Sequence, residues 1–270
     1  MPFPPTERVS YNNNPLNQVV CQLRFPSILK IEATLPADFQ DSIRSAFPIF
    51  QERQGQPISQ LPAELEDAIP SDLRRFLPRG SSGYDFISVD KEWQVTLTRD
   101  FLALRTSSYS RWEEFTNRLS GPLNSLKQIY TPAFFTRIGL QYRNLIQRQE
   151  IDQTDVEWSD LIQPHLAGIL SDSDVGPRVN DCTQIATLRL EGTLGQVRIQ
   201  HGLVMIEETD EVAYLIDSDF FSDQRTEVGH ETRLLDQYHQ KAGRLFRWCI
   251  TPRLHSAMGP KPLSGENIRG

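Results

Sequence analysis

The sequence predicts an α+β protein built from two tandem β-α-β-β-β-α repeats, each a curved antiparallel sheet backed by a long helix. Three observations lead to this prediction. Segments with apolar residues at every second position are interspersed with segments of helical spacing. The order strand, helix, three strands, helix occurs twice along the chain. Finally, Gln22-Leu23-Arg24 in the first copy falls opposite Gln141-Tyr142-Arg143 in the second.

The first predicted repeat covers residues 1–131 and opens with a strand, VVCQLRF, at 19–25. The residues of this strand that alternate onto one side are apolar, so we expect that side to face a helix. They are Val19, Cys21, Leu23 and Phe25. Helical spacing follows at 36–50. The Gln-, Pro-, Asp- and Arg-rich residues 51–82 predict a long loop or insert, with a short helix at LPAELEDAI, 61–69.

Three strands and a long helix complete the first repeat. The strands YDFISVD, WQVTLTR and FLALRTSSY, at 84–90, 93–99 and 101–109, are joined by short polar steps that suit an antiparallel meander. One apolar stripe then marks a helix from Trp112 to Tyr130. Ser110 and Glu113 predict a capping box at its start, and Gly121-Pro122 predicts a kink or break within it.

The second predicted repeat covers residues 132–258 and has the same order of elements. A strand at 134–146 is followed by a helix at 155–170 that has a proline near its middle. Three strands are expected at 183–192, 196–207 and 211–221, and a long helix at 230–258 with a break near Thr251-Pro252. We expect residues 259–270 to form a flexible tail.

The distribution of charge narrows the choice of partners. The net charge is −7, and residues 150–231 carry eighteen acidic against four basic residues, whereas the residues from 232 onward carry a net charge of +5. An acidic surface repels phosphates, so nucleic acid is disfavoured as a partner. The segment could instead meet a basic partner, mimic a nucleic-acid backbone or bind a hard cation, or it could be a solvated acid-rich surface.

The same composition indicates a cytoplasmic protein. We find no apolar run of eighteen residues, so no membrane span is expected, and the first residues do not read as a secretory signal. The three cysteines, Cys21, Cys182 and Cys249, are far apart and odd in number. This pattern is typical of buried thiols in a reducing compartment.

Three landmarks carry a family resemblance. They are NPLNQVVCQLRFP at 14–26, RIGLQYRNLI at 137–146 and GRLFRWCITPRLHSAMG at 243–259. In this order they resemble a sporadically distributed bacterial family of uncharacterised proteins of about this length. The resemblance implies a bacterial accessory protein, with a role such as defence, immunity or toxin neutralisation, and it supplies no catalytic residue.

No motif for nucleotide binding, serine hydrolysis or a zinc cluster is present in the sequence. Our leading hypothesis is therefore a non-enzymatic binding or regulatory module that recognises a protein partner and needs no cofactor. The acidic segment 150–231 and the polar side of the two Gln-x-Arg strands are the candidate surfaces. Arginines suit the second surface to binding, because arginine binds carboxylate and phosphate bidentately. Its residues are Gln22, Arg24, Arg137, Gln141 and Arg143.

Two alternatives remain open at this stage. The same polar residues could hold a small anionic ligand in a groove between the repeats, or could simply hydrogen-bond to acids of a neighbouring strand. An enzyme could use Asp217 and Asp219, two apart on one strand face, with Glu207 from the preceding strand. Such carboxylates could hold magnesium for a phosphodiesterase or nuclease, or could form an ordinary polar strand face.

Overall fold

The structure is a computed structural model that describes residues 3–53, 83–206 and 209–262. It combines helices with antiparallel sheets, which confirms the predicted α+β class. The chain divides into two compact units. The first contains residues 1–19, 139–224 and 231–270, and the second contains residues 20–138 and 225–230. The division passes through strands β2 (Leu16–Arg24) and β7 (Arg137–Ile146).

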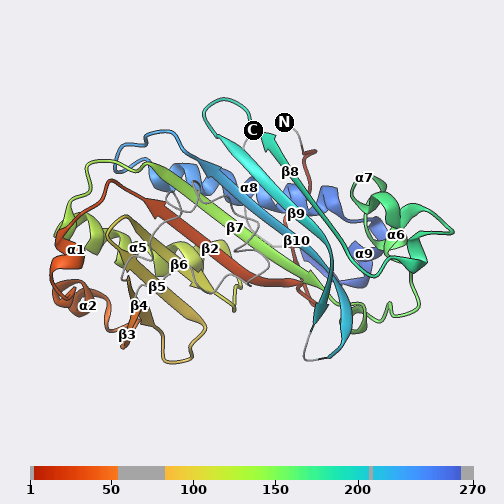
Figure 1. Cartoon of the computed structure of the whole chain (residues 1–270), viewed down its shortest axis with the longest axis horizontal. Helices are drawn as coiled ribbons and strands as arrows, with labels where there is room; N and C mark the ends of the chain where they lie inside the picture. Colours follow the sequence, from red (N-terminus) through yellow and green to blue (C-terminus); the bar gives the residue numbers. More distant parts are fainter. Residues whose placement is uncertain (1–2, 54–82, 207–208, 263–270) are drawn as a thin grey trace, which may run out of the picture. The chain divides into compact units, whose positions relative to one another are not determined.

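The second unit is a sheet with the strand order β3-β4-β5-β6-β2 (Figure 1). The new strands are β3 (Ile49–Arg53), β4 (Gly83–Ile87), β5 (Trp93–Thr98) and β6 (Phe101–Thr106). The predicted meander is confirmed, because β4, β5 and β6 pair antiparallel in succession. The helices are α1 (Lys30–Ala33), α2 (Ala37–Ile43) and α5 (Trp112–Tyr130).

Helix α5 corrects two predictions. It continues through Gly121-Pro122 instead of breaking there, because its apolar stripe is buried along the whole length and offsets the hydrogen bond that the proline lacks. The predicted capping box is also wrong. Arg111 occupies the N-cap position without a capping hydrogen bond from its side chain, and the Ser110 hydroxyl donates to the side chain of Glu114 rather than capping a backbone N–H.

The predicted long loop begins later than expected. Residues 51–53 belong to strand β3, which pairs with β4 in the register Gln51 to Asp85. A charged, exposed strand with the pattern IFQER carries little apolar alternation, so its pairing could not be read from the sequence. The rest of the segment, with the helix predicted at 61–69, lies outside the described residues.

The first unit has the strand order β7-β10-β9-β8 (Figure 1). The strands are β8 (Cys182–Arg189), β9 (Gln196–Ile206) and β10 (Glu211–Ser222), with helices α8 (Glu231–Cys249) and α9 (Pro252–Ala257) after them. A separate two-stranded sheet pairs β1 (Val9–Tyr11) with β11 (Pro260–Pro262). The first residues of the predicted tail therefore form a strand.

The connection between β7 and β8 consists of short helical turns. The single helix predicted at 155–170 is wrong, because Pro164, which has no N–H for an upstream carbonyl, instead begins a new turn. The turns are η1 (Gln149–Ile151), α6 (Trp158–Leu161), α7 (Pro164–Ala167), η2 (Gly168–Ser171) and η3 (Gly176–Arg178). Because each short turn changes the direction of the chain, such a segment can present side chains toward more than one neighbouring element.

Each unit buries one face of its sheet under helices. In the second unit, Trp93 of β5 packs on Phe115 of α5. In the first unit, Phe220 of β10 packs on Tyr238 of α8. The predicted helix-facing residues of the opening strand are all buried, as expected: Val19, Cys21, Leu23 and Phe25. Within the described residues, no helix is long and apolar enough to cross a membrane.

Candidate binding pocket in the first unit

Three of the predicted binding residues meet in the second unit. The carbonyl oxygen of the Gln22 side chain accepts hydrogen bonds from Arg24 Nε at 3.0 Å and from Arg137 Nη1 at 3.3 Å. Arg24 is exposed, while Gln22 and Arg137 are half-buried. One amide oxygen thus holds two guanidinium groups side by side, and guanidinium is the group that binds carboxylate and phosphate bidentately.

The other two predicted residues lie in the first unit, among acidic and basic side chains of one sheet face. Gln141 Nε2 donates to both carboxylate oxygens of Asp217, at 2.8 and 2.9 Å. The strand register places Asp217 opposite Gln200 and Asp219 opposite Arg198. Burial raises the pKa of Asp217, although Gln141, Arg143 and Arg198 act to lower it. Gln141 is therefore committed to Asp217, whereas Arg143 is exposed.

The predicted metal ligands are only partly described. Asp217 and Asp219 lie two apart on β10, and Glu207 lies outside the described residues. Within the described parts of the chain, no three His, Cys, Asp or Glu side chains are grouped closely enough to hold a metal ion. Asp217 already accepts from the Gln141 amide, and the charges of Arg143 and Arg198 lie nearby. Positive charge at these two arginines disfavours a metal cation at the Asp217 carboxylate.

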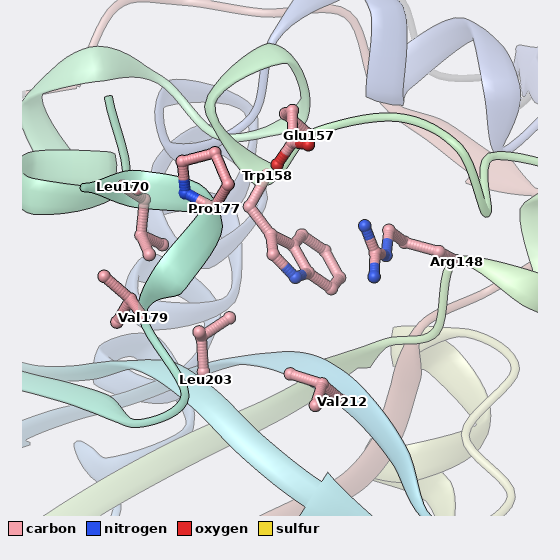
Figure 2. A pocket seen from close by; sticks show the side chains of 9 residues that line it. Arg148, Glu157, Trp158, Leu170, Pro177, Val179, Leu203 and Val212 are labelled. Carbon is pink, nitrogen blue, oxygen red and sulfur yellow. The ribbon is translucent and has the colours of Figure 1, made fainter. Parts of the chain in front are cut away.

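A pocket of about 130 Å³ opens between the β7–β8 connection and the sheet of the first unit (Figure 2). Its walls come from four places: the chain after β7, α6, the η2–η3 turns, and the strands β9 and β10. The lining residues are Arg148, Glu157, Trp158, Leu170, Gly176, Pro177, Val179, Leu203 and Val212. All but Arg148 and Glu157 are apolar or glycine, so the pocket has an apolar interior and two charged groups.

Arg148 and Trp158 form one side of the pocket. The guanidinium carbon of Arg148 lies 4.9 Å from the centre of the Trp158 ring, and Figure 2 shows the side chain pointing toward the indole. Arg148 Nη1 donates to the carbonyl oxygen of Val156 at 2.8 Å. No carboxylate of the described residues lies within ion-pair distance of this guanidinium. Its other donors are therefore available to a ligand.

The Trp158 ring packs on the buried ring of Tyr214, which in turn contacts a buried histidine. It lies 5.6 Å from the ring of Tyr214, whose hydroxyl is 2.9 Å from Nδ1 of His201. Burial raises the pKa of Tyr214 and lowers that of His201, so both groups are neutral at pH 7. The tryptophan itself is 6% exposed. This support holds the indole in place, because Tyr214 and His201 are buried and uncharged.

The size of the pocket restricts what it can bind. Pockets for whole metabolites or cofactors usually enclose roughly 300–1,000 Å³. An apolar cavity of about 150 Å³ accommodates a benzene molecule. At 130 Å³, this pocket matches one apolar side chain or a similar small group rather than a nucleotide.

Sequence reasoning missed this site. Its residues come from the irregular segment between β7 and β8 and from single positions of two strands, so no spacing joins them. The available signals were the unusual length of that connection and a tryptophan within a polar stretch, DVEWSD. Both signals indicate a functional loop without naming its partners.

Comparisons with known proteins do not assign the chain to a family. No protein-family model matches the chain. A search of curated proteins likewise finds no match.

Proposed function

We propose that this chain is a non-enzymatic binding module that takes an apolar side chain of a basic protein partner into the Trp158 pocket. The observation that carries the proposal is the Arg148 guanidinium, which stacks on Trp158 at an apolar pocket and has donors with no described partner. Tryptophan and arginine are the residue types most often found at the energetic centre of protein interfaces.

The two charged lining residues can orient a docked peptide. Arg148 can donate to a backbone carbonyl or carboxylate oxygen beside the anchoring side chain. Glu157, which is exposed, can accept from an N–H group or from a basic side chain on the opposite side. A peptide supplies such acceptors and donors along its backbone, so an extended segment with one apolar anchor suits the pocket.

The charge of the surrounding segment indicates which kind of protein would approach. Residues 150–231, which include most of the pocket, have eighteen acidic and four basic residues. The negative electrostatic field of these residues accelerates the encounter with a basic partner, and added salt weakens this field. Binding should therefore depend on salt, while the apolar anchor should keep part of the affinity at high salt.

A peptide-display selection on the purified chain tests this proposal. We expect enrichment of basic peptides with one fixed apolar residue. Replacing Arg148 by alanine should weaken the selected peptides roughly 5- to 30-fold, the range for an interface contact of about 1–2 kcal/mol. Arg233→Ala, on the exposed start of α8 and outside the pocket lining, is the control with the same change of charge. Selected peptides that bind both variants equally would refute the pocket as the binding site.

We further propose that the two units arose by internal duplication, as the repeat in the sequence suggests. The strand orders β4-β5-β6-β2 and β8-β9-β10-β7 support this proposal, since each places the first strand of a copy beside its last. A long helix follows the last strand in both, α5 in one and α8 in the other. A bacterial role in defence or toxin neutralisation remains a prediction that rests on the family resemblance alone, and the cytoplasmic location remains a prediction from composition.

A further inference from the structure

Strand β8 lies at one end of its sheet (Figure 1). It pairs with β9 along its whole length, from Cys182 opposite Leu203 to Arg189 opposite Gln196. Among the described residues, no strand pairs with its other side. Such an edge presents a row of backbone N–H and C=O groups that can pair with a further strand.

This edge has few of the features that usually prevent strand addition. Edge strands are commonly protected by proline, by charged side chains, by a bulge or by being short. The eight residues of β8, CTQIATLR, contain no proline, their one charged residue is Arg189 at the end, and their pairing with β9 is continuous. Ile185, near the centre of the strand, is 56% exposed. A strand added at this edge would cover part of the Ile185 side chain and remove apolar surface from water.

We propose that β8 pairs antiparallel with β8 of a second copy of this chain, with Ile185 opposite its own counterpart. This interface is separate from the Trp158 pocket and does not depend on the proposed partner. In a two-fold pair of this kind, residues equally far before and after Ile185 face each other. Thr183 then lies opposite Thr187, and Asp181 lies opposite Arg189.

A second copy is proposed as the partner of this edge because the sequence of β8 is complementary to itself. Asp181 and Arg189 are both exposed, and neither has an ion-pair partner among the described residues. Opposite charges, paired threonines and paired β-branched residues are favourable cross-strand neighbours in an antiparallel sheet. All of them fall on one face, because the positions differ by even numbers.

Neighbouring registers lose this complementarity. Moving the two-fold axis to Gln184 places Arg189 opposite Val179, and moving it to Ala186 places Arg189 opposite Thr183. Of these three registers, only the one centred on Ile185 pairs both charges and buries isoleucine against isoleucine. A different protein could add a strand to the same edge, but the match of β8 to itself favours a second copy.

Light scattering of the purified full chain tests the association. The wild type should move from 31.0 kDa toward twice that mass as its concentration rises. Arg189→Asp places two carboxylates opposite each other and should raise the dissociation constant about tenfold or more. The exchange Asp181→Arg with Arg189→Asp should restore the dimer. Arg233→Asp, which changes an exposed arginine of α8, should leave it intact. A wild type that stays at 31.0 kDa at all concentrations would overturn the proposal.

Single cysteines test the register, in a Cys182→Ser background that removes the half-buried thiol of this strand. Under mild oxidation, Ile185→Cys should form a disulfide between two copies, because each new thiol meets its counterpart. Thr183→Cys and Thr187→Cys alone should not, whereas the two together should. A dimer cross-linked by Thr187→Cys alone would refute this pairing. A monomer whose Ile185→Cys captures another protein would assign the edge to that protein instead.

Discussion

The guanidinium carbon of Arg148 lies 4.9 Å from the centre of the Trp158 ring, at a pocket with an otherwise apolar lining. A guanidinium over an indole face is stabilised by the ring quadrupole, which holds it without neutralising its charge. The contact therefore places a positively charged donor at the pocket, where a carbonyl or carboxylate oxygen of a docked segment could accept from it.

The wall of the pocket depends on a close approach at Gly176. A Cβ at this position would lie 2.5 Å from the carbonyl oxygen of Leu170, which is backbone and cannot move aside alone. Gly176→Ala should therefore lower the free energy of unfolding by about 1–3 kcal/mol, as overpacking does. Urea denaturation measures this change.

The matched control for this substitution is Gly243→Ala, inside helix α8 of the same unit. An added Cβ there meets nothing within 4 Å. It should stabilise the protein by roughly 0.5–1 kcal/mol, because alanine is the better helix residue. Equal effects of the two substitutions would show that the contact with Leu170 is unimportant.

The buried histidine below the pocket should make the protein sensitive to acid. Burial lowers the pKa of His201 from 6.5, so the unfolded chain binds a proton that the folded chain resists. The part of the unfolding free energy that is linked to His201 is then fully present above pH 6.5, and it is lost as the pH falls below that value. His165 and His255 are shifted in the same direction. His201→Gln should reduce this loss without abolishing it.

Urea unfolding at about pH 7.5 and pH 5.5 measures this effect, on either side of the ordinary histidine pKa. The difference between the two pH values should be smaller in His201→Gln than in the wild type. An unchanged difference would mean that His201 is protonated equally in both states.

The carboxylate of Asp217 should have the opposite dependence on pH. Burial raises its pKa above the ordinary 3.8, so the folded chain binds the proton more tightly than the unfolded chain does. Its charge destabilises the fold increasingly as the pH rises through the folded pKa. Asp217→Asn should raise the melting temperature at pH 7 and leave it nearly unchanged below pH 3.8. A melting temperature that falls at pH 7 would indicate that the charge is needed.

In the second unit, the buried Asp85 should be a strong structural contact. One of its oxygens accepts from Arg53 Nε at 3.1 Å and Nη2 at 2.8 Å, and the other accepts from Thr96 Oγ1 at 2.6 Å. Asp85→Ala should cost about 1.5–3 kcal/mol, the range for hydrogen bonds to a charged group. A double-mutant cycle with Arg53→Ala separates the part due to the arginine, and additive costs would show that the two residues are uncoupled.

Much of the fold could be predicted from the sequence, because most of its strands and its two long helices carry periodic apolar patterns. The strand at Val19 to Phe25 shows this well, since its alternating residues are all buried. Errors arose where one residue type was read alone. Pro122 was expected to kink or break its helix, and the buried stripe keeps that helix continuous. The Ser110 hydroxyl was expected to cap the helix backbone, and it donates to a side chain instead.

The candidate site was less predictable than the fold. The pairing of Gln141 with Asp217 joins strands that are far apart in sequence, so the amide and the carboxylate could be proposed separately but not as a pair. The Trp158 pocket depends on how five short helical turns pack, and no periodicity describes such turns. Tertiary packing alone brings Arg148, Leu170 and Val212 together.

The most direct test of the proposed binding site is the indole N–H spectrum of the chain during titration with a display-selected basic peptide. The protein has four tryptophans, and only Trp158 lines the pocket. Its signal can be assigned by Trp158→Phe. We predict that the Trp158 resonance shifts in proportion to bound peptide, while those of Trp93, Trp112 and Trp248 stay in place. Saturable binding that leaves the Trp158 resonance unmoved would contradict the account.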